Sequence, residues 1–179
     1  MRTTEYALLA FILGLLAMLL PLSVDGFVAL VPALAKYYSV SSGSVQLCIS
    51  SVILGIAVGQ TIHGPLSDGF GRKPVLIGGV FCYVIVSIMC MYTFQIEVLI
   101  VLRFFQGLFA CSGIIVARAI IRDLFDREAG ARLFATMMGI HGLMPILIPG
   151  VSGWLVTVYG WPAMFLTMSI FGGAVLAIV

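Results

Sequence analysis

The most informative stretch of the sequence runs from Gly64 to Pro74 and reads GPLSDGFGRKP. It joins two apolar runs, and its glycines permit a tight turn with close backbone contact. Asp68 can accept hydrogen bonds from a helix N-terminus or from an arginine, and Arg118 and Arg122 are suitable partners. We expect a turn of about ten residues here. The charges alone would fit a solvated turn, but the pattern G-x-L-x-D-x-x-G-R-K between apolar runs is more specific.

The runs on either side of this stretch belong to a chain that is apolar throughout. Of its 179 residues, 62% are apolar and 9% are charged, and the mean hydropathy is +1.22. Soluble domains average about 45–50% apolar and about 25% charged residues. This difference excludes a soluble enzyme, a nucleic-acid binder and a disordered chain. The net charge of +2 is too small to indicate polyanion binding. The remaining class is an integral membrane protein in a lipid bilayer.

A membrane-spanning helix needs about 20 residues, and the sequence has six apolar runs of suitable length. We therefore predict an all-α integral membrane protein, a single bundle of six transmembrane helices over residues 1–179. The first run is longer than the membrane is thick, so it must tilt, bend or protrude, with Pro21 and Pro32 as bend points. The predicted spans cover residues 6–36, 45–63, 75–92, 96–119, 133–156 and 162–179.

The cysteines lie inside these runs and form no CxxC pair. They are therefore interpreted as small apolar core residues rather than as disulfides or metal ligands. No metal or organic cofactor is expected. The residues concerned are Cys48, Cys82, Cys90 and Cys111.

Basic residues predict the orientation, because loops on the cytoplasmic side carry an excess of Lys and Arg. One predicted side has Lys36 as its basic residue, and the chain's final residues 174–179 are wholly apolar, which suggests that more sequence should follow. The N-terminus is predicted to lie in the cytoplasm, beneath the inner membrane. The opposite, basic side carries Arg2, Arg72, Lys73, Arg118, Arg122, Arg127 and Arg132.

Two charges lie inside predicted spans, Asp25 in the first and Arg103 in the fourth. Each costs roughly 2.5–3.5 kcal/mol at a helix centre. Two interpretations stay open: a structural ion pair, or a role in coupling protons or substrate. Gln46 and Gln60 share a helix face, and either hydrogen-bond between helices or line a cavity. His141, which shares a face with two prolines, is either a titrating group or a hydrogen-bonded core residue.

Four ordered motifs resemble those of one transporter family. The stretch 59–68, GQTIHGPLSD, together with 69–74, resembles the signature between helices two and three of the major facilitator superfamily, in its bicyclomycin/chloramphenicol-resistance branch of drug:proton antiporters. The stretch 21–27, PLSVDGF, is similar to the first-helix motif with its membrane-embedded Asp25. RFFQG at 103–107 resembles the fourth-helix motif, and 117–123, ARAIIRD, the end of that helix. Pro145, Pro149 and Gly153 resemble the fifth-helix antiporter motif.

The resemblance implies the N-terminal half of a proton-coupled exporter of drugs or small molecules, built as a 3+3 inverted repeat. It implies Asp25 as the proton-binding carboxylate and Arg103 as its charge partner. The remaining implied positions are a cytoplasmic gate (Gly64, Asp68, Gly71, Arg72, Lys73), a helix-four group (Gln106, Gly107, Arg118), the helix-five residues named above, and possible cavity lining (Phe27, Gln46, Gln60, His141). Gly69 stands where the loop motif commonly has Arg, so one gate charge is missing.

Family members have about twelve helices in two six-helix halves, and this chain matches the first half. Three interpretations follow. The chain is part of a transporter whose C-terminal half is absent here. Alternatively it is a truncated, non-transporting remnant or an interaction partner. In the third interpretation it is a half-transporter that works as a dimer with a second copy.

Overall fold

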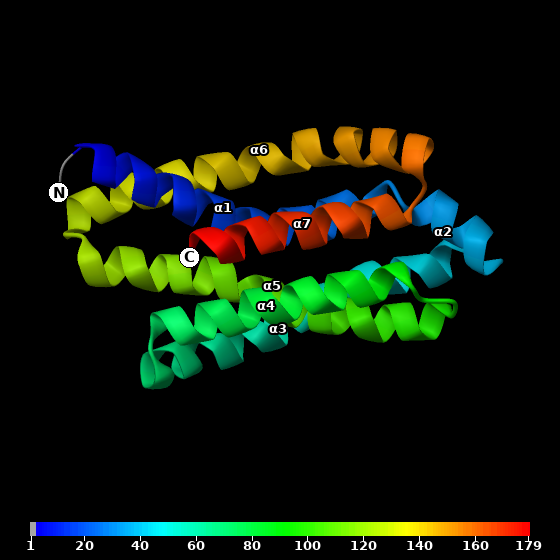
Figure 1. The fold of residues 1–179 in the computed structure, drawn as a ribbon, viewed down its shortest axis with the longest axis horizontal. Helices are drawn as coiled ribbons and strands as arrows, with labels where there is room; N and C mark the ends of the chain where they lie inside the picture. The colour runs from blue at the N-terminus through cyan, green and yellow to red at the C-terminus, as the bar shows by residue number, and fades with distance from the viewer. Residues whose placement is uncertain (1–2) are drawn as a thin grey trace.

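The computed structural model describes the backbone of residues 3–179 and the side chains from residue 8 onward, so Arg2 lies outside it. Within these residues the chain forms seven α-helices and no strand. The long helices lie side by side along the longest axis of the molecule, and the short α2 lies at one end (Figure 1). The helices are α1 (Thr3–Val28), α2 (Val31–Tyr38), α3 (Ser42–Phe70), α4 (Arg72–Met91), α5 (Ile96–Leu124), α6 (Arg127–Tyr159) and α7 (Pro162–Ile178).

Among the described residues, five helices are long and apolar enough to cross a membrane: α1, α3, α4, α5 and α6. The apolar α7 is shorter, at 17 residues. The chain is therefore an all-α, multi-pass membrane protein, as predicted from its sequence.

The first predicted span is not one helix. It divides into α1 and α2 at Ala29 and Leu30, where the Leu30 N–H donates to the carbonyl of Phe27 at 2.9 Å. Pro32 lies in the first turn of α2, where backbone N–H groups have no acceptor within the helix. The N–H that proline lacks therefore costs no helical hydrogen bond. Pro21 stays inside α1. The bend thus falls next to the second of the two prolines that the sequence pointed to.

The expected turn of about ten residues after the second span is wrong. α3 continues through Gly64 and Pro65 to Phe70, and α4 begins at Arg72, so Gly71 alone lies between the two helices. Gly71 has φ +93° and ψ 156°, a conformation open essentially to glycine, and it reverses the chain in one step. Gly160 has φ +83° and ψ 169° between α6 and α7, and makes the same kind of turn at the opposite end.

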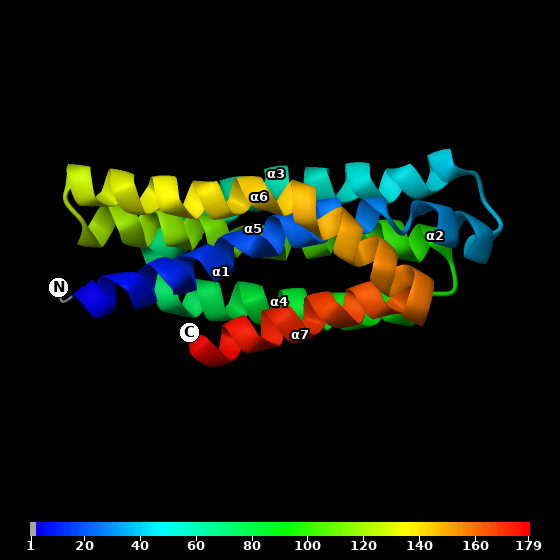
Figure 2. The same ribbon diagram turned by 90° about the horizontal axis from the view of Figure 1, so that it is seen from above.

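The packing of the helices shows the 3+3 inverted repeat. If α1, α3 and α4 are exchanged with α5, α6 and α7, each major contact becomes another contact of the bundle. The contact of α3 with α5 becomes that of α6 with α1, and the contact of α4 with α5 becomes that of α7 with α1. The contacts of α1 with α5 and of α4 with α7 map onto themselves; α1 and α5 lie in the middle of the bundle, and α4 and α7 lie together along one edge of it (Figure 2).

Glycines allow α3 and α5 to pack closely. A Cβ atom on Gly55 of α3 would collide with the carbonyl oxygen of Phe104, and one on Gly107 of α5 would collide with that of Val52. Small residues at such crossings let two backbones approach, which replaces the hydrophobic driving force that lipid does not supply. Gly107, which the sequence assigned to a functional motif, is therefore a packing residue at this crossing.

The two ends of the bundle differ in charge. We call the end where α3 meets α4 the Gly71 end and the opposite one the Gly160 end; the α5–α6 connection also lies at the Gly71 end (Figure 1). Lys36 lies on α2, at the Gly160 end. The basic residues in or beside the Gly71 end are Arg72, Lys73, Arg118, Arg122, Arg127 and Arg132.

Candidate functional site

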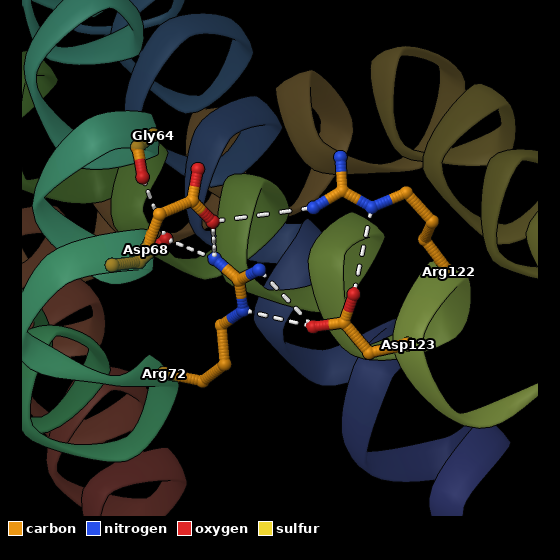
Figure 3. A network of polar contacts seen from close by, with 6 residues as sticks. Gly64, Asp68, Arg72, Arg122 and Asp123 are labelled. Carbon is orange, nitrogen blue, oxygen red and sulfur yellow. Dashed lines mark hydrogen bonds and ion pairs between the residues drawn. The ribbon is translucent and has the colours of Figure 1, made fainter.

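The first polar network lies at the Gly71 end and is centred on Arg72, the first residue of α4 (Figure 3). The single-residue turn at Gly71 brings its guanidinium back to the last turns of α3. There Nη1 donates to a carboxylate oxygen of Asp68 and, at 2.7 Å, to the Ser67 hydroxyl. Across the bundle, Nε donates to Oδ2 of Asp123 on α5 at 3.1 Å. One arginine therefore ties α3, α4 and α5 together at this end.

Arg122 is the second cation of the network. Its Nη2 lies 4.0 Å from Oδ1 of Asp68, and its Nε lies 3.5 Å from Oδ1 of the neighbouring Asp123. Of the two partners predicted for Asp68, the structure thus brings Arg122 near, but Arg72 is the closer one. Arg118 lies over the ring of Phe134 on α6, 5.7 Å from its centroid.

Asp123 is the residue of this network that sequence reasoning missed. It stood within the 117–123 stretch, at the end of a predicted helix, and received no role of its own. The spacing of Asp68 and Arg72, four residues apart, is the usual signal for a pair on one helix. Here the pair forms even though Gly71 interrupts the helix between them. Gly64 takes part through its carbonyl, which accepts from the Ser67 hydroxyl at 2.9 Å, and Lys73 is exposed.

A cavity of about 360 Å³ opens beside this network, between α3 and α5. Gln60, one of the two predicted cavity-lining glutamines, lies on its wall with Asp68, Arg72 and Arg118. Gln46, the other one, lines a separate cavity of about 480 Å³ near the α1–α2 bend, with Pro32 and Ser50. The two glutamines therefore lie on the walls of different hollows.

The second polar network lies inside the bundle and is centred on Arg103 of α5, which is completely buried. Its Nη2 donates to the carbonyl of Ser23 on α1 at 2.5 Å, and its Nη1 donates to Oε1 of Gln106. Its guanidinium carbon lies 4.3 Å from the ring centroid of Phe27. Among the described residues, Nε of Arg103 has no hydrogen-bond partner. A buried cation is thus held by a carbonyl, an amide and an aromatic ring.

Gln106 extends this network to α4 and α7. Its Nε2 donates to the Ser87 hydroxyl on α4 at 2.7 Å and lies 3.4 Å from the sulfur of Met168 on α7. The hydroxyls of Ser23 and Tyr83 are hydrogen-bonded at 2.9 Å and close the network between α1 and α4. The fourth-helix motif residues therefore connect α1, α4, α5 and α7 in the centre of the bundle.

The predicted pairing of Asp25 with Arg103 is wrong in this structure: among the described residues, no carboxylate lies within 4.0 Å of the guanidinium. Successive helix residues turn by about 100° around the axis, so Ser23 and Asp25 point in nearly opposite directions. Arg103 meets the Ser23 carbonyl, whereas Asp25 is half-buried and interacts electrostatically with His141 on α6.

His141 is itself anchored to α1. Its Nδ1 lies 3.2 Å from the carbonyl of Ala17, and because a carbonyl can only accept, Nδ1 carries the hydrogen in this contact. The side chain is half-buried. His141 is thus a titratable group of α6 held against α1, the helix that carries Asp25.

Phe27 was expected to line a cavity, but it is completely buried between the Arg103 guanidinium and Phe165 of α7. The cause is the cation, which takes the aromatic face as one of its neutral partners. Pro145, Pro149 and Gly153 lie within α6. Pro145 is exposed, and a Cβ on Gly153 would meet open space, so this part of α6 is not covered by the described helices.

A bundle of membrane-spanning helices built as an inverted repeat around a buried charge network is the architecture of a secondary transporter half. The family model described as Major Facilitator Superfamily matches residues 9–179. The chain belongs to the major facilitator superfamily, a family of membrane transporters.

Curated relatives carry names from this family. The chain is 35% identical over 170 residues to the Uncharacterized MFS-type transporter YdgK of Bacillus subtilis, covering 94% of this chain and 42% of that protein. It is 32% identical over 160 residues to the Bicyclomycin resistance protein homolog of Haemophilus influenzae, covering 89% and 40%. It is 31% identical over 161 residues to the Multidrug resistance protein MdtL of Escherichia coli O157:H7, covering 90% and 41%. The chain thus spans about two fifths of the length of these relatives, and it matches their N-terminal part.

Proposed function

We propose that this chain is the N-terminal half of an exporter that exchanges drugs or other small molecules for protons. The observation that carries the proposal is the separation of Asp25 from Arg103. Asp25 is a half-buried carboxylate without an ion-pair partner within 4.0 Å among the described residues. A carboxylate locked to a buried arginine would stay ionised, whereas this one can take up and release a proton.

Arg103 supports this function from the other side of α1. The groups around its guanidinium are neutral and do not cancel its charge. Its positive potential therefore reaches α1, where its Nη2 donates to the Ser23 carbonyl. A change in the charge of Asp25 would alter the balance of forces on the same helix. In this proposal Asp25 binds the proton, His141 is its titratable neighbour, and Arg103 is a positioning residue that holds α1.

The Gly71 end is proposed to lie on the cytoplasmic side of the inner membrane. It carries the basic residues of the described chain except Lys36 and the buried Arg103, which is the arrangement that the positive-inside rule predicts. The network of Arg72, Asp68, Asp123 and Arg122 would then form part of the cytoplasmic gate. It joins the ends of α3 and α4 to the end of α5 in the state described here.

The drug class is proposed from the names of the relatives, one of which is a Bicyclomycin resistance protein homolog.

The test uses everted membrane vesicles from cells that express the coding sequence containing this chain. Bicyclomycin uptake and proton release are followed together after an imposed pH gradient. Asp25→Asn is compared with Glu97→Gln, which neutralises an exposed carboxylate in the first turn of α5. We expect Asp25→Asn to abolish coupled transport and Glu97→Gln to leave it intact. Unchanged coupled transport by Asp25→Asn would overturn the assignment.

A working unit that includes a second six-helix bundle is favoured by the surface of α6. Its apolar side chains remain uncovered, and they include Leu143, Ile146, Leu147, Val151 and Trp154. This face fits a C-terminal half or a second copy of the chain. The mass of the 179-residue chain in detergent distinguishes them, because a half that needs its C-terminal partner stays monomeric and a dimeric half-transporter does not.

A further inference from the structure

A third cavity lies apart from both networks, at the junction of α3, α4 and α5. Its volume is about 450 Å³, and its walls include Phe70 of α3, Gly78 and Cys82 of α4, and Phe109 of α5. Phe70 is exposed at its edge. In a membrane-spanning chain, an apolar hollow that is open at the surface is filled from the bilayer, because water gains nothing from entering it.

One nitrogen makes this cavity selective. His63 of α3 lines it, and the His63 side chain is 95% buried, with 5% of its surface exposed. Its Nδ1 lies 2.9 Å from the carbonyl of Gly59 and therefore carries the ring hydrogen of the neutral imidazole. Nε2 is then a hydrogen-bond acceptor. Within the part of the chain that the structure describes, Nε2 makes no hydrogen bond.

Nε2 lies near Gly79 of α4, where the buried Ser112 hydroxyl of α5 is also close. Nε2 lies 3.6 Å from the place where a Cβ on Gly79 would stand, and Gly79 lines the same cavity. Nδ1 points the other way, toward Gly59 and the sulfur of Cys111, which is 3.8 Å from it. The cavity thus offers apolar walls and one ring nitrogen, on a largely buried histidine, that makes no hydrogen bond to the described residues, and such an acceptor favours a ligand that brings one donor.

We propose that this cavity binds a membrane-dissolved amphiphile, an aliphatic alcohol or a lipid of the same chemistry, whose hydroxyl donates to Nε2 of His63. The chain of the amphiphile packs between Phe70, Phe109 and the open surface at Gly78. An alkane or an ether satisfies the walls but not Nε2, and an ion would have to enter an apolar hollow without a counter-charge. The site does not depend on the proposed export function, since it shares no residue with the networks of Arg72 and Arg103.

The test measures binding to the purified chain in phosphatidylcholine nanodiscs. A dodecanol that carries a photoreactive diazirine is cross-linked to the protein, and the labelled peptides are mapped by mass spectrometry. Unlabelled dodecanol and dodecyl methyl ether, which lacks a donor, compete with the label. We expect label in the peptides around residues 63–82 and roughly two- to tenfold weaker competition by the ether, as one net hydrogen bond implies. Equal competition by the two compounds would overturn the proposal.

Substitutions at two positions, Gly78 and His63, test the residues of the cavity. A Cβ on Gly78 has no heavy atom within 4 Å, so Gly78→Leu fills the cavity without a clash and should abolish the labelling. Gly173→Leu on α7 is its matched control, because it adds the same side chain where a Cβ also meets open space. His63→Leu should reduce competition by dodecanol to that of the ether, and His63→Gln, which keeps an acceptor, should restore part of the difference. Labelling that survives Gly78→Leu in a helical, monodisperse sample would show that the amphiphile binds elsewhere.

Discussion

Arg103 shows how a single residue can be both buried and charged in this bundle. Hydrogen bonds from an ionised donor are stronger than neutral ones, and Arg103 makes them to the Ser23 carbonyl and the Gln106 amide. The Phe27 face adds a cation–π contact of about 2 kcal/mol when both groups are desolvated. These neutral partners replace a carboxylate, which leaves the acidic residue of the same region, Asp25, free for another task.

At the residue scale, we predict that Gln106→Leu destabilises the protein. The substitution keeps the side-chain size but removes the acceptor of Arg103 and the donor to Ser87, at a cost of roughly 1.5–3 kcal/mol for the charged bond. Thermal unfolding in detergent should show a clear decrease in Tm. Gln95→Leu is the control, since Gln95 is exposed and makes no side-chain cap. An equal Tm for the two variants would contradict the description of Arg103 as a buried cation held by neutral partners.

Two helix pairs are joined by short reversals that use a glycine with positive φ, with one residue between α3 and α4 and two between α6 and α7. Gly71 links α3 to α4 and Gly160 links α6 to α7, and both have a positive φ with an extended ψ. These are corresponding connections of the inverted repeat, at opposite ends of the bundle. The reversal at Gly71 has a consequence for the network beside it, because it places Arg72 next to Asp68 and within reach of Asp123.

At the element scale, we predict opposite effects for two neighbouring glycines. Gly71→Ala forces a side chain into a backbone conformation that costs about 1–3 kcal/mol, and it should lower Tm. Gly69→Ala lies within α3, where a Cβ meets nothing within 4 Å, and it should raise stability by roughly 0.5–1 kcal/mol. Unfolding of both variants in the same detergent gives the comparison. If Gly71→Ala were as stable as Gly69→Ala, the one-residue reversal would be incorrect.

The whole molecule has an internal symmetry in its helix packing, but its two ends differ in charge. The contacts of the helices repeat between the two triplets, whereas the basic residues gather at the Gly71 end. Symmetry of packing follows from helix shape and small residues, but the charge bias belongs to the ends of the helices. A bundle of this kind inserts in one orientation because the two ends interact differently with the cytoplasmic leaflet.

At the scale of the whole molecule, we predict that Lys36→Cys reacts with a membrane-impermeant maleimide in intact spheroplasts, and that Lys73→Cys reacts only after the cells are opened. Both lysines are exposed at opposite ends of the bundle. Cys82 is replaced by Ala in both variants because it is the one half-buried cysteine, the other three being buried. The reverse labelling pattern would invert the proposed orientation and with it the cytoplasmic position of the Arg72 network.

The all-α membrane fold and the order of its motifs could be derived from the amino-acid sequence. Each rests on local information: apolar runs long enough to cross a bilayer, charges that are expensive inside them, and a glycine-rich stretch between two of them. The polar partners of the motif residues could not be derived in the same way. Arg103 and Asp25 are both charged, and opposite charges in neighbouring helices suggest a pair, but Asp25 interacts with His141 instead.

The physical reason is that a contact between helices depends on their rotation and on their relative depth, which no single helix encodes. Ser23 and Asp25 are two positions apart, and this spacing decides which one α5 meets. The close crossing of α3 and α5 at Gly55 and Gly107 sets how these two helices lie against each other. The pairing of Arg72 with Asp123 depends on Gly71 taking a conformation that its sequence neighbours permit but do not require. Hydropathy is a property of each segment, whereas the charge networks exist only once the segments have packed.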